Sequence, residues 1–182
     1  MSNPLLGADE FTDAFARHGR TLWVIASAWV GRADAADLVQ EAARVAWERR
    51  QQFAVGSDVR AWLAQIPRHL GANWRRRNRR ELPTSVAVHS LVAPQPAVPL
   101  WPFDAERHGL SEELARGLAS LPEIARACLL LQVVMGHTFA EIAVILDIPE
   151  NTASSHARRA RLALREAMTT YVPVEAEARK TP

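Results

Sequence analysis

Residues 151–161 (NTASSHARRAR) combine short hydrogen-bonding side chains with three arginines and contain no acidic residue. Serine, threonine and asparagine can bind phosphates and base edges, and arginine can hold a phosphate or a guanine through two hydrogen bonds. The alternative without a binding function is a helix whose basic side contacts only solvent. The segment is therefore a candidate surface for a polyanion such as nucleic acid.

A second basic segment lies in the first half of the chain. Residues 59–80 contain seven arginines and no acid, whereas residues 81–150 contain nine acids and three arginines. The formal net charge of +2 over 182 residues therefore conceals two basic blocks separated by an acidic one. This pattern indicates two separate anionic contacts rather than one diffuse attraction.

The elements around residues 151–161 are predicted to be two helices joined by a tight turn. Thr138 and Glu141 form a capping box that opens a short helix, residues 147–149 (DIP) end it, and a longer helix runs from about Glu150 to Met168. A preceding helix is predicted to start at a capping box of Ser120 and Glu123 and to end near Gly136. This is the helix-turn-helix arrangement, in which the start of the second helix enters the major groove.

Eight residues of the longer helix are predicted to face bases and phosphates. They are Asn151, Thr152, Ser154, Ser155, His156, Arg158, Arg159 and Arg161.

The first half of the chain predicts three amphipathic helices, over residues 8–30, 32–53 and 59–81, with Asp34 as the N-cap of the second. Trp47 and Trp74 are interpreted as core residues, while Trp62 is assigned equally to the core and to nucleotide contact. Pro67 falls inside the third helix and is predicted to kink it, either shaping a binding pocket or as a tolerated surface bend.

Residues 82–109 predict a linker, because they hold five of the 11 prolines and show no helical period. The fold is thus predicted to be all-α, with small helical domains at 1–81 and 110–170 and a tail at 171–182. If polyproline-like, the 28 linker residues would span about 87 Å, at ~3.1 Å each. Their apolar side chains predict that part of the linker docks on this protein or a partner: Leu91, Leu100, Trp101 and Phe103.

Several classes of protein are disfavoured by composition. The single Cys128 can form no internal disulfide and is interpreted as a buried apolar residue. No metal-ligand spacing, phosphate loop or nucleophile elbow occurs, so no enzyme, metal or cofactor is expected. The first residues lack a signal-peptide pattern, and the apolar run 22–30 is too short to cross a membrane, which predicts a cytoplasmic location.

Three segments occur in an order that is characteristic of one family. They are DAADLVQEAARVAW, VRAWLAQIPRHLGANWRRR and, after the linker, LPEIARACLLLQVVMGHTFAEIAVILDIPENTASSHARRARLAL. In sequence and spacing they resemble the extracytoplasmic-function class of bacterial sigma factors, with region two at about 10–81 and region four at about 110–168. The resemblance implies three partners: core RNA polymerase, promoter DNA and an anti-sigma factor.

The resemblance also implies a role for each block of region two. Core polymerase would be bound by Asp37, Leu38, Gln40, Glu41 and Arg44. The minus-ten element would be melted and an extruded base held around Phe53, Trp62, Ile66 and His69, with flanking phosphates on Arg68, Arg75, Arg76 and Arg77. Region four would read the minus-thirty-five element through the eight residues named above.

Departures from the family pattern leave the promoter sequence open. His69 stands where asparagine is common, Ser154 and His156 stand where basic residues are usual, and Pro149 replaces a capping serine. Two other functions are alternatives: a stand-alone helix-turn-helix regulator, and an interaction module that is held by an anti-sigma partner or mimics a sigma factor in a partner switch. A simple regulator has no reason to carry region two, and a mimic is expected to have acids in place of the arginine blocks.

Overall fold

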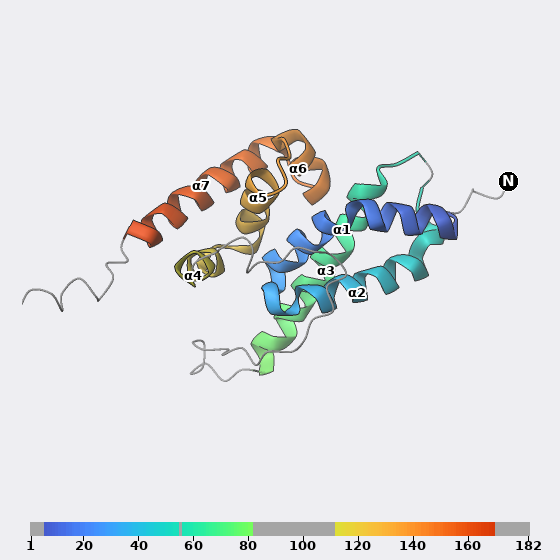
Figure 1. The fold of residues 1–182 in the computed structure, drawn as a ribbon, viewed down its shortest axis with the longest axis horizontal. Helices are drawn as coiled ribbons and strands as arrows, with labels where there is room; N and C mark the ends of the chain where they lie inside the picture. Colours follow the sequence, from blue (N-terminus) through green and yellow to red (C-terminus); the bar gives the residue numbers. More distant parts are fainter. Residues whose placement is uncertain (1–5, 55, 82–111, 170–182) are drawn as a thin grey trace, which may run out of the picture.

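The computed structural model describes residues 6–54, 56–81 and 112–169, and within these ranges every regular element is a helix (Figure 1). The elements, in chain order, are α1 (Ala8–Val30), α2 (Arg32–Arg49), the 3-10 turn η1 (Arg50–Gln52), α3 (Val59–Glu81), α4 (Glu112–Ser120), α5 (Glu123–Val133), α6 (Phe139–Leu146) and α7 (Glu150–Thr169). The all-α prediction is confirmed. The predicted linker and tail lie outside the described residues.

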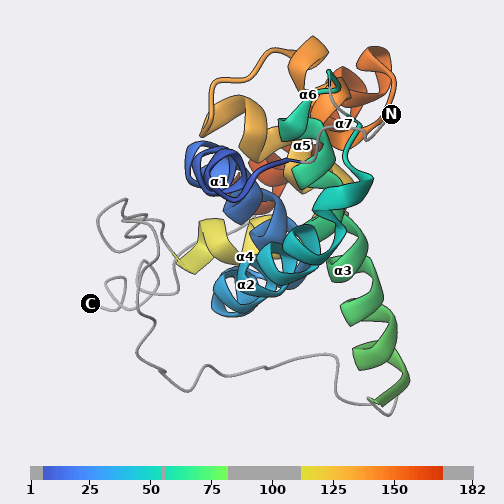
Figure 2. The same cartoon turned by 90° about the vertical axis from the view of Figure 1, so that its right-hand side faces the viewer.

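The helices form two groups that pack directly against each other. Helices α1, α2 and α3 form one bundle, and α4 to α7 form the other. Contact between the groups is made where α1 packs against α5 and where α3 packs against α6, while the C-terminal part of α3 projects beyond its bundle (Figures 1 and 2).

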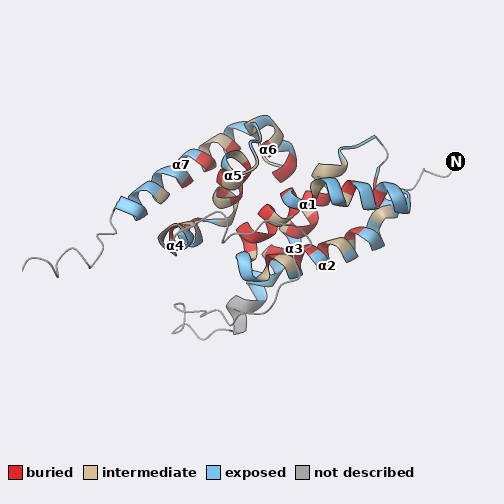
Figure 3. Ribbon diagram, in the orientation of Figure 1, coloured by how far each residue is buried: buried red, intermediate tan, exposed pale blue. Residues whose placement is uncertain are grey.

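The apolar core is continuous across both groups (Figure 3). Its most buried large side chains come from α1, α3, α5 and α6 and are at most 1% exposed: Leu22, Ile25, Leu63, Leu131, Ile142, Ile145 and Leu146. A smaller separate cluster lies between α5 and α7 and consists of Leu121, Ala125, Leu129 and Ala160, with Leu118 of α4 packed against it. The two helical groups therefore share one core.

Two predicted helix caps are wrong, and one is confirmed. Gly31, at φ 85°, turns the chain so sharply that α2 begins at Arg32, which leaves Asp34 inside the first turn. Ser120 ends α4, where its hydroxyl donates to the Gly117 carbonyl at 2.8 Å, and the N-cap residue of α5 is Pro122. The Thr138–Glu141 capping box is present, with Glu141 N–H donating to Thr138 Oγ1 at 3.2 Å.

The exposed fractions of Trp47, Trp74 and Pro67 contradict what was predicted for these three residues. Trp47 and Trp74 are 40% and 36% exposed and are not core residues. Trp47 lies at an outer edge, with its ring between Phe11 and the Arg50 guanidinium, which is 3.8 Å from the ring centre. Pro67 is fully buried inside α3, so the surface-bend interpretation is wrong.

Cys128 is buried, as predicted, and burial raises the pKa of its thiol to about 12. Along the described part of the chain, no helix is long and apolar enough to cross a membrane. The same ranges contain no group of three His, Cys, Asp or Glu side chains arranged to hold a metal ion.

Candidate nucleic-acid interface

Helix α7 presents one side to the core and the opposite side to solvent. Ala153, Ala157 and Ala160 are buried, and their small size lets α7 pack closely on α5 and α6. Asn151 and Arg158 are exposed on the opposite side, which also carries the partly exposed Ser155. The first half of α7 thus places an amide, a hydroxyl and a guanidinium along one line that is accessible to a ligand.

The other predicted residues of α7 flank this line. Arg159 and Arg161 are exposed, whereas Thr152, Ser154 and His156 are partly buried. The Ser154 hydroxyl donates to the Asn151 carbonyl at 3.0 Å, so its proton is already used within the helix.

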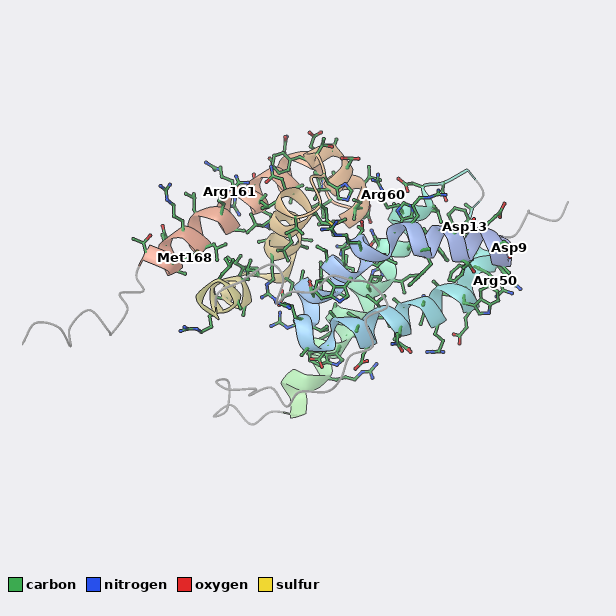
Figure 4. The ribbon with its side chains drawn as sticks, in the orientation of Figure 1. Asp9, Asp13, Arg50, Arg60, Arg161 and Met168 are labelled. Atoms are coloured by element: carbon green, nitrogen blue, oxygen red, sulfur yellow. The ribbon has the colours of Figure 1, made fainter. Side chains whose placement is uncertain are left out.

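A groove of about 270 Å³ runs beside α7 and is lined by three helices. The α7 residues Ser155, Arg158 and Arg161 meet Gln132 of α5 and Phe139 of α6 there, and Arg161 donates to Gln132 Oε1 at 2.8 Å (Figure 4). Gln132 and Phe139 were missed by sequence reasoning. The capping box placed Phe139 at the start of α6, but nothing in the sequence pattern indicated that Gln132 reaches α7.

Helix α3 has two sides with different surroundings. Trp62, His69 and Arg76 are spaced seven residues apart and lie on one line, since a helix turns about 100° per residue. His69, Arg76 and Arg77 are exposed on this side, and Trp62 is partly exposed. Part of the predicted minus-ten set is thus brought together on an accessible surface.

Phe53 and Ile66, by contrast, are only 6% and 8% exposed. The Phe53 ring packs edge-on against Trp62 with 5.4 Å between centroids. Two of the side chains that were predicted to hold a base are therefore in contact with each other.

The other side of α3 faces the α4–α7 group. Arg60 pairs with Glu141 at 3.6 Å, and Arg60 lies where the two groups meet (Figure 4). Arg68 donates to the carbonyl of Leu146, at the end of α6. Arg75 pairs with Glu123 at the start of α5. Arg68 and Arg75 therefore do not share a surface with His69 and Arg76.

Helix α2 offers a polar surface on its outer side. Asp37, Gln40, Glu41 and Arg44 are exposed, while Leu38 is 7% exposed and belongs to the core. Arg44 donates to Glu41 and to Glu48, and the hydrogen bond from Arg44 lowers the pKa of Glu41. Leu38 thus positions this surface, and the other four residues are available to a partner.

Two histidines lie at the junction between the groups, where α1, α3 and α6 approach one another. His18 of α1 and His137, just before α6, are both close to Arg60. Asp58 and Arg17 also lie near His18. A Glu141 carboxylate oxygen lies 3.7 Å from His137 Nδ1. Burial lowers the pKa of both histidines below 6.5, and Arg60 adds to this effect. His137 Nε2 is buried and has no hydrogen-bond partner among the described residues.

These surroundings predict that the folded protein is stabilised as the pH rises through the histidine range. Because the pKa values of both histidines are lower in the folded chain, the unfolded chain binds more protons than the folded chain below about pH 6.5. The histidine contribution to the free energy of unfolding is therefore fully present above about pH 6.5. It is lost as the pH falls through the lower pKa values of the folded chain. Urea unfolding of the wild type should show a falling free energy of unfolding between about pH 7.5 and 5.5.

His137→Gln should flatten this pH dependence, whereas His69→Gln, at an exposed histidine outside the junction, should leave it unchanged. Equal slopes for the wild type and His137→Gln would contradict the assignment.

Comparison with known proteins gives two family matches, one for each helical group. Residues 14–81 match the model for sigma-70 region 2, and residues 111–164 match that for sigma-70 region 4. The ECF RNA polymerase sigma-E factor of Escherichia coli K12 is 31% identical over 146 residues, covering 77% of this chain and 76% of that protein.

Two further matches differ in coverage. "Probable RNA polymerase sigma factor RfaY" of Xanthomonas campestris is 28% identical over 71% of this chain, but the match spans only 32% of that protein's length. The sigma factor RpoE of Bartonella quintana, solved in complex with the anti-sigma factor NepR, has a TM-score of 0.67 and 25% identity, covering 91% of this chain and all of that one.

Both helical groups, in their order along the chain, thus correspond to sigma-70 regions, and the sigma-E relative is matched across most of its length. The chain belongs to the extracytoplasmic-function group of the sigma-70 family, whose members bind core RNA polymerase and direct transcription initiation at promoters.

Proposed function

We propose that this sigma factor binds its partners through three surfaces. The outer side of α2 binds core polymerase, the exposed side of α3 binds the minus-ten element, and α7 binds the minus-thirty-five element. The observation that carries the proposal is that one chain displays an exposed polar side of α2 together with two separate basic helices. A regulator that acts without polymerase would need only α7.

The geometry of α7 supports its proposed role. Its solvent side begins at the N-terminus of the helix, where backbone N–H groups add a positive partial charge that attracts phosphate. Asn151, Ser155 and Arg158 then occupy the line that a recognition helix turns toward base edges. The groove beside Gln132 gives Arg161 a fixed position from which it reaches the flanking backbone.

The mixture of aromatic and basic groups on α3 supports its proposed role. A base taken out of the duplex needs a stacking surface, because unpairing costs about a few kcal/mol and base–aromatic stacking returns about 1–3 kcal/mol. Trp62 and His69 supply rings on the exposed side, and Arg76 and Arg77 supply cations next to them. We infer that Phe53 moves away from Trp62 when a base enters.

The polymerase surface can be tested by placing an arginine on it. Gln40→Arg and Asp37→Arg place a cation on the outer side of α2 without touching the core, so they should weaken competition for core polymerase by roughly 10-fold, as expected for loss of electrostatic complementarity. Competition against the labelled wild type for purified core polymerase measures this effect.

Asp13→Arg is the matched control, since it reverses an exposed charge on α1 instead. Circular dichroism should be unchanged for all three variants. If both α2 variants compete for core polymerase as well as the wild type does, the outer side of α2 is not the polymerase-binding surface.

We further propose that an anti-sigma factor binds this chain in the bacterial cytoplasm and that the chain has no catalytic activity of its own. Support comes from the similarity to a sigma factor crystallised with an anti-sigma factor, and from Val133 of α5, which is 63% exposed. Recovery of core polymerase alone, from both resting and stressed native cells, would contradict the anti-sigma proposal. The candidate contacts Trp101 and Phe103 lie outside the described residues.

A further inference from the structure

Gln132 of α5 is bonded to an arginine of α7 that lies 29 residues further along the chain. The Arg161 guanidinium donates a hydrogen bond to Gln132 Oε1 at 2.8 Å. Gln132 is partly buried, whereas Arg161 is exposed, and both line the groove beside α7. The hydrogen bond therefore ties an exposed cation of the basic helix to a neighbouring helix.

The acceptor on Gln132 is itself held in place. Gln132 is the last residue but one of α5, which ends at Val133, and its carbonyl accepts from the Gly136 N–H at 3.2 Å. The C-terminus of a helix carries a partial negative charge, which favours a guanidinium nearby. Both the side chain of Gln132 and the end of its helix thus draw Arg161 toward α5.

Arg158 lines the same groove but is not held in this way. The two arginines are three residues apart on α7, so their Cα atoms differ by about 4.5 Å along the helix and by about 60° around it. Within residues 6–54, 56–81 and 112–169, Arg158 has no hydrogen-bond or ion-pair partner. One arginine of the groove is thus tied to α5, and the other is available to a ligand.

This difference matters for the selection of a base. A guanidinium can bind either a guanine edge or a phosphate, and only the contact with the base edge carries sequence information. If Arg161 were not tied, it could reach the same acceptors as Arg158, because both side chains line one groove. A hydrogen bond that draws Arg161 toward α5 removes that competition.

The position of Arg161 along α7 favours a backbone contact. The N-terminal residues of a recognition helix contact base edges. Arg161 lies ten residues after Asn151, which is about 15 Å along the helix, so it is expected beyond those bases and next to the bordering phosphates. None of the six residues that line the groove is acidic, so nothing there repels a phosphate.

We propose that Gln132 is a positioning residue for promoter recognition, which holds Arg161 toward a backbone phosphate and away from the base edge that Arg158 faces. One arginine of the groove then selects a base, and the other binds phosphate. The inference rests on the proposed function of α7 and adds to it a residue of α5 that acts only through Arg161.

The test selects DNA from a duplex library randomised over both promoter elements, using the full chain with core polymerase. Arg158→Ala should lose the preference at one base pair of the minus-thirty-five element, which identifies the base that Arg158 contacts. Gln132→Ala should lower the preference at that same base pair by roughly 3- to 10-fold, part of the roughly 5- to 150-fold discrimination of a bidentate contact. If Arg158→Ala lost no preference at any position, the division between the two arginines would be wrong.

Two further variants distinguish positioning from a packing role. Gln132→Glu keeps an acceptor for Arg161, so the base preference should stay at the wild-type level. Its carboxylate neutralises the guanidinium, so the log–log salt slope of DNA binding should be smaller by about 0.9. A residue that only packed would tolerate glutamate no better than alanine. Gln132→Ala combined with Arg161→Ala should restore the preference, because the competing guanidinium is absent.

Gln51→Ala is the matched control, since it removes an exposed glutamine of η1 that is distant in sequence from the groove. It should change neither the base preference nor the salt slope. Loss of preference in this control equal to that in Gln132→Ala would contradict the positioning role.

A measurement without DNA separates this inference from the proposed function. In ¹⁵N relaxation spectra of the free full-length chain, the Nε–H group of Arg161 should be restricted in the wild type and mobile in Gln132→Ala, while that of Arg158 is mobile in both. Arg161→Ala and Arg158→Ala assign the two signals. Equal mobility of the two arginines in the wild type, or an unchanged base preference in Gln132→Ala, would overturn the positioning role. A restricted Arg161 in a chain whose polymerase complex selects no minus-thirty-five sequence would instead support the Gln132 contact and refute the proposed function of α7.

Discussion

Replacing Gly71 by alanine is expected to destabilise the protein, although alanine is the better helix former. Gly71 is buried in α3, and an added Cβ would lie 2.6 Å from Cβ and 2.9 Å from Cγ of Trp29. The Trp29 Cβ is fixed to the backbone of α1, so the clash is relieved only if α1 and α3 move apart. Overpacking of this kind costs about 1–3 kcal/mol, against a helix-propensity gain of about 1 kcal/mol.

Gly117→Ala is a matched control with the opposite expectation. Gly117 is also a buried glycine within a helix, and its added Cβ would lie 2.6 Å from a neighbouring atom. That atom is Leu164 Cδ1, the end of a flexible side chain that can rotate away. The helix-propensity gain should therefore dominate, and the free energy of unfolding should stay level or rise by up to about 1 kcal/mol.

Thermal and urea unfolding of the two variants decide the matter. The melting temperature should fall by roughly 5 °C for Gly71→Ala, on the scale of about 2–4 °C per kcal/mol for a chain of this size. If Gly71→Ala is as stable as Gly117→Ala, α1 and α3 are not packed as closely as described here.

Much of the fold could be predicted from sequence, because its helices are long and amphipathic. Helices α1, α3 and α7 were predicted within a residue or so of their observed bounds, since their apolar positions recur at helical spacing. Thr138 and Glu141 marked the start of α6 because both partners of the capping box are local in sequence.

The N-caps of α2 and α5 were predicted wrongly because neighbouring residues determine where these helices begin. Ser120 and Glu123 have the spacing of a capping box, but α4 continues to Ser120 and the chain enters α5 at Pro122 instead. Asp34 has the right residue type for an N-cap, but Gly31 had already turned the chain. In both places the competing structure lies only a few residues away.

The sequence could not predict which arginines of α3 contact the α4–α7 group and which are exposed on the other side of the helix. In sequence, Arg75 and Arg76 are adjacent members of one basic run, and only the position of α5 next to Glu123 distinguishes them. Nor could the pairing of Arg68 with α6 be inferred, because its partner is a backbone carbonyl 78 residues away that has no sequence signature. The exposed line on α7 was predictable, since it is simply the side opposite three buried alanines.

The shared core leads to the prediction with the largest expected effect. Leu131 of α5 is completely buried in the cluster that also contains Leu22 and Ile25 of α1. Leu131→Ala should lower the free energy of unfolding by about 2–5 kcal/mol, the usual cost of such a cavity. Because the cluster is continuous, hydrogen exchange should accelerate in α1 as well as in α5 and α6.

Leu129→Ala provides the comparison, two residues away on the same helix. Leu129 is 5% exposed but belongs to the smaller cluster with Leu121, Ala125 and Ala160. Its truncation should cost a similar amount, yet the faster exchange should be confined to α4, α5 and α7, leaving α1 protected. If Leu131→Ala also left α1 protected, the two groups would be independent domains in solution. The contacts of Arg60, Arg68 and Arg75 with α5 and α6 would then be too weak to hold the two groups together, because partly exposed ion pairs rarely exceed about 1 kcal/mol each without a buried apolar surface beside them.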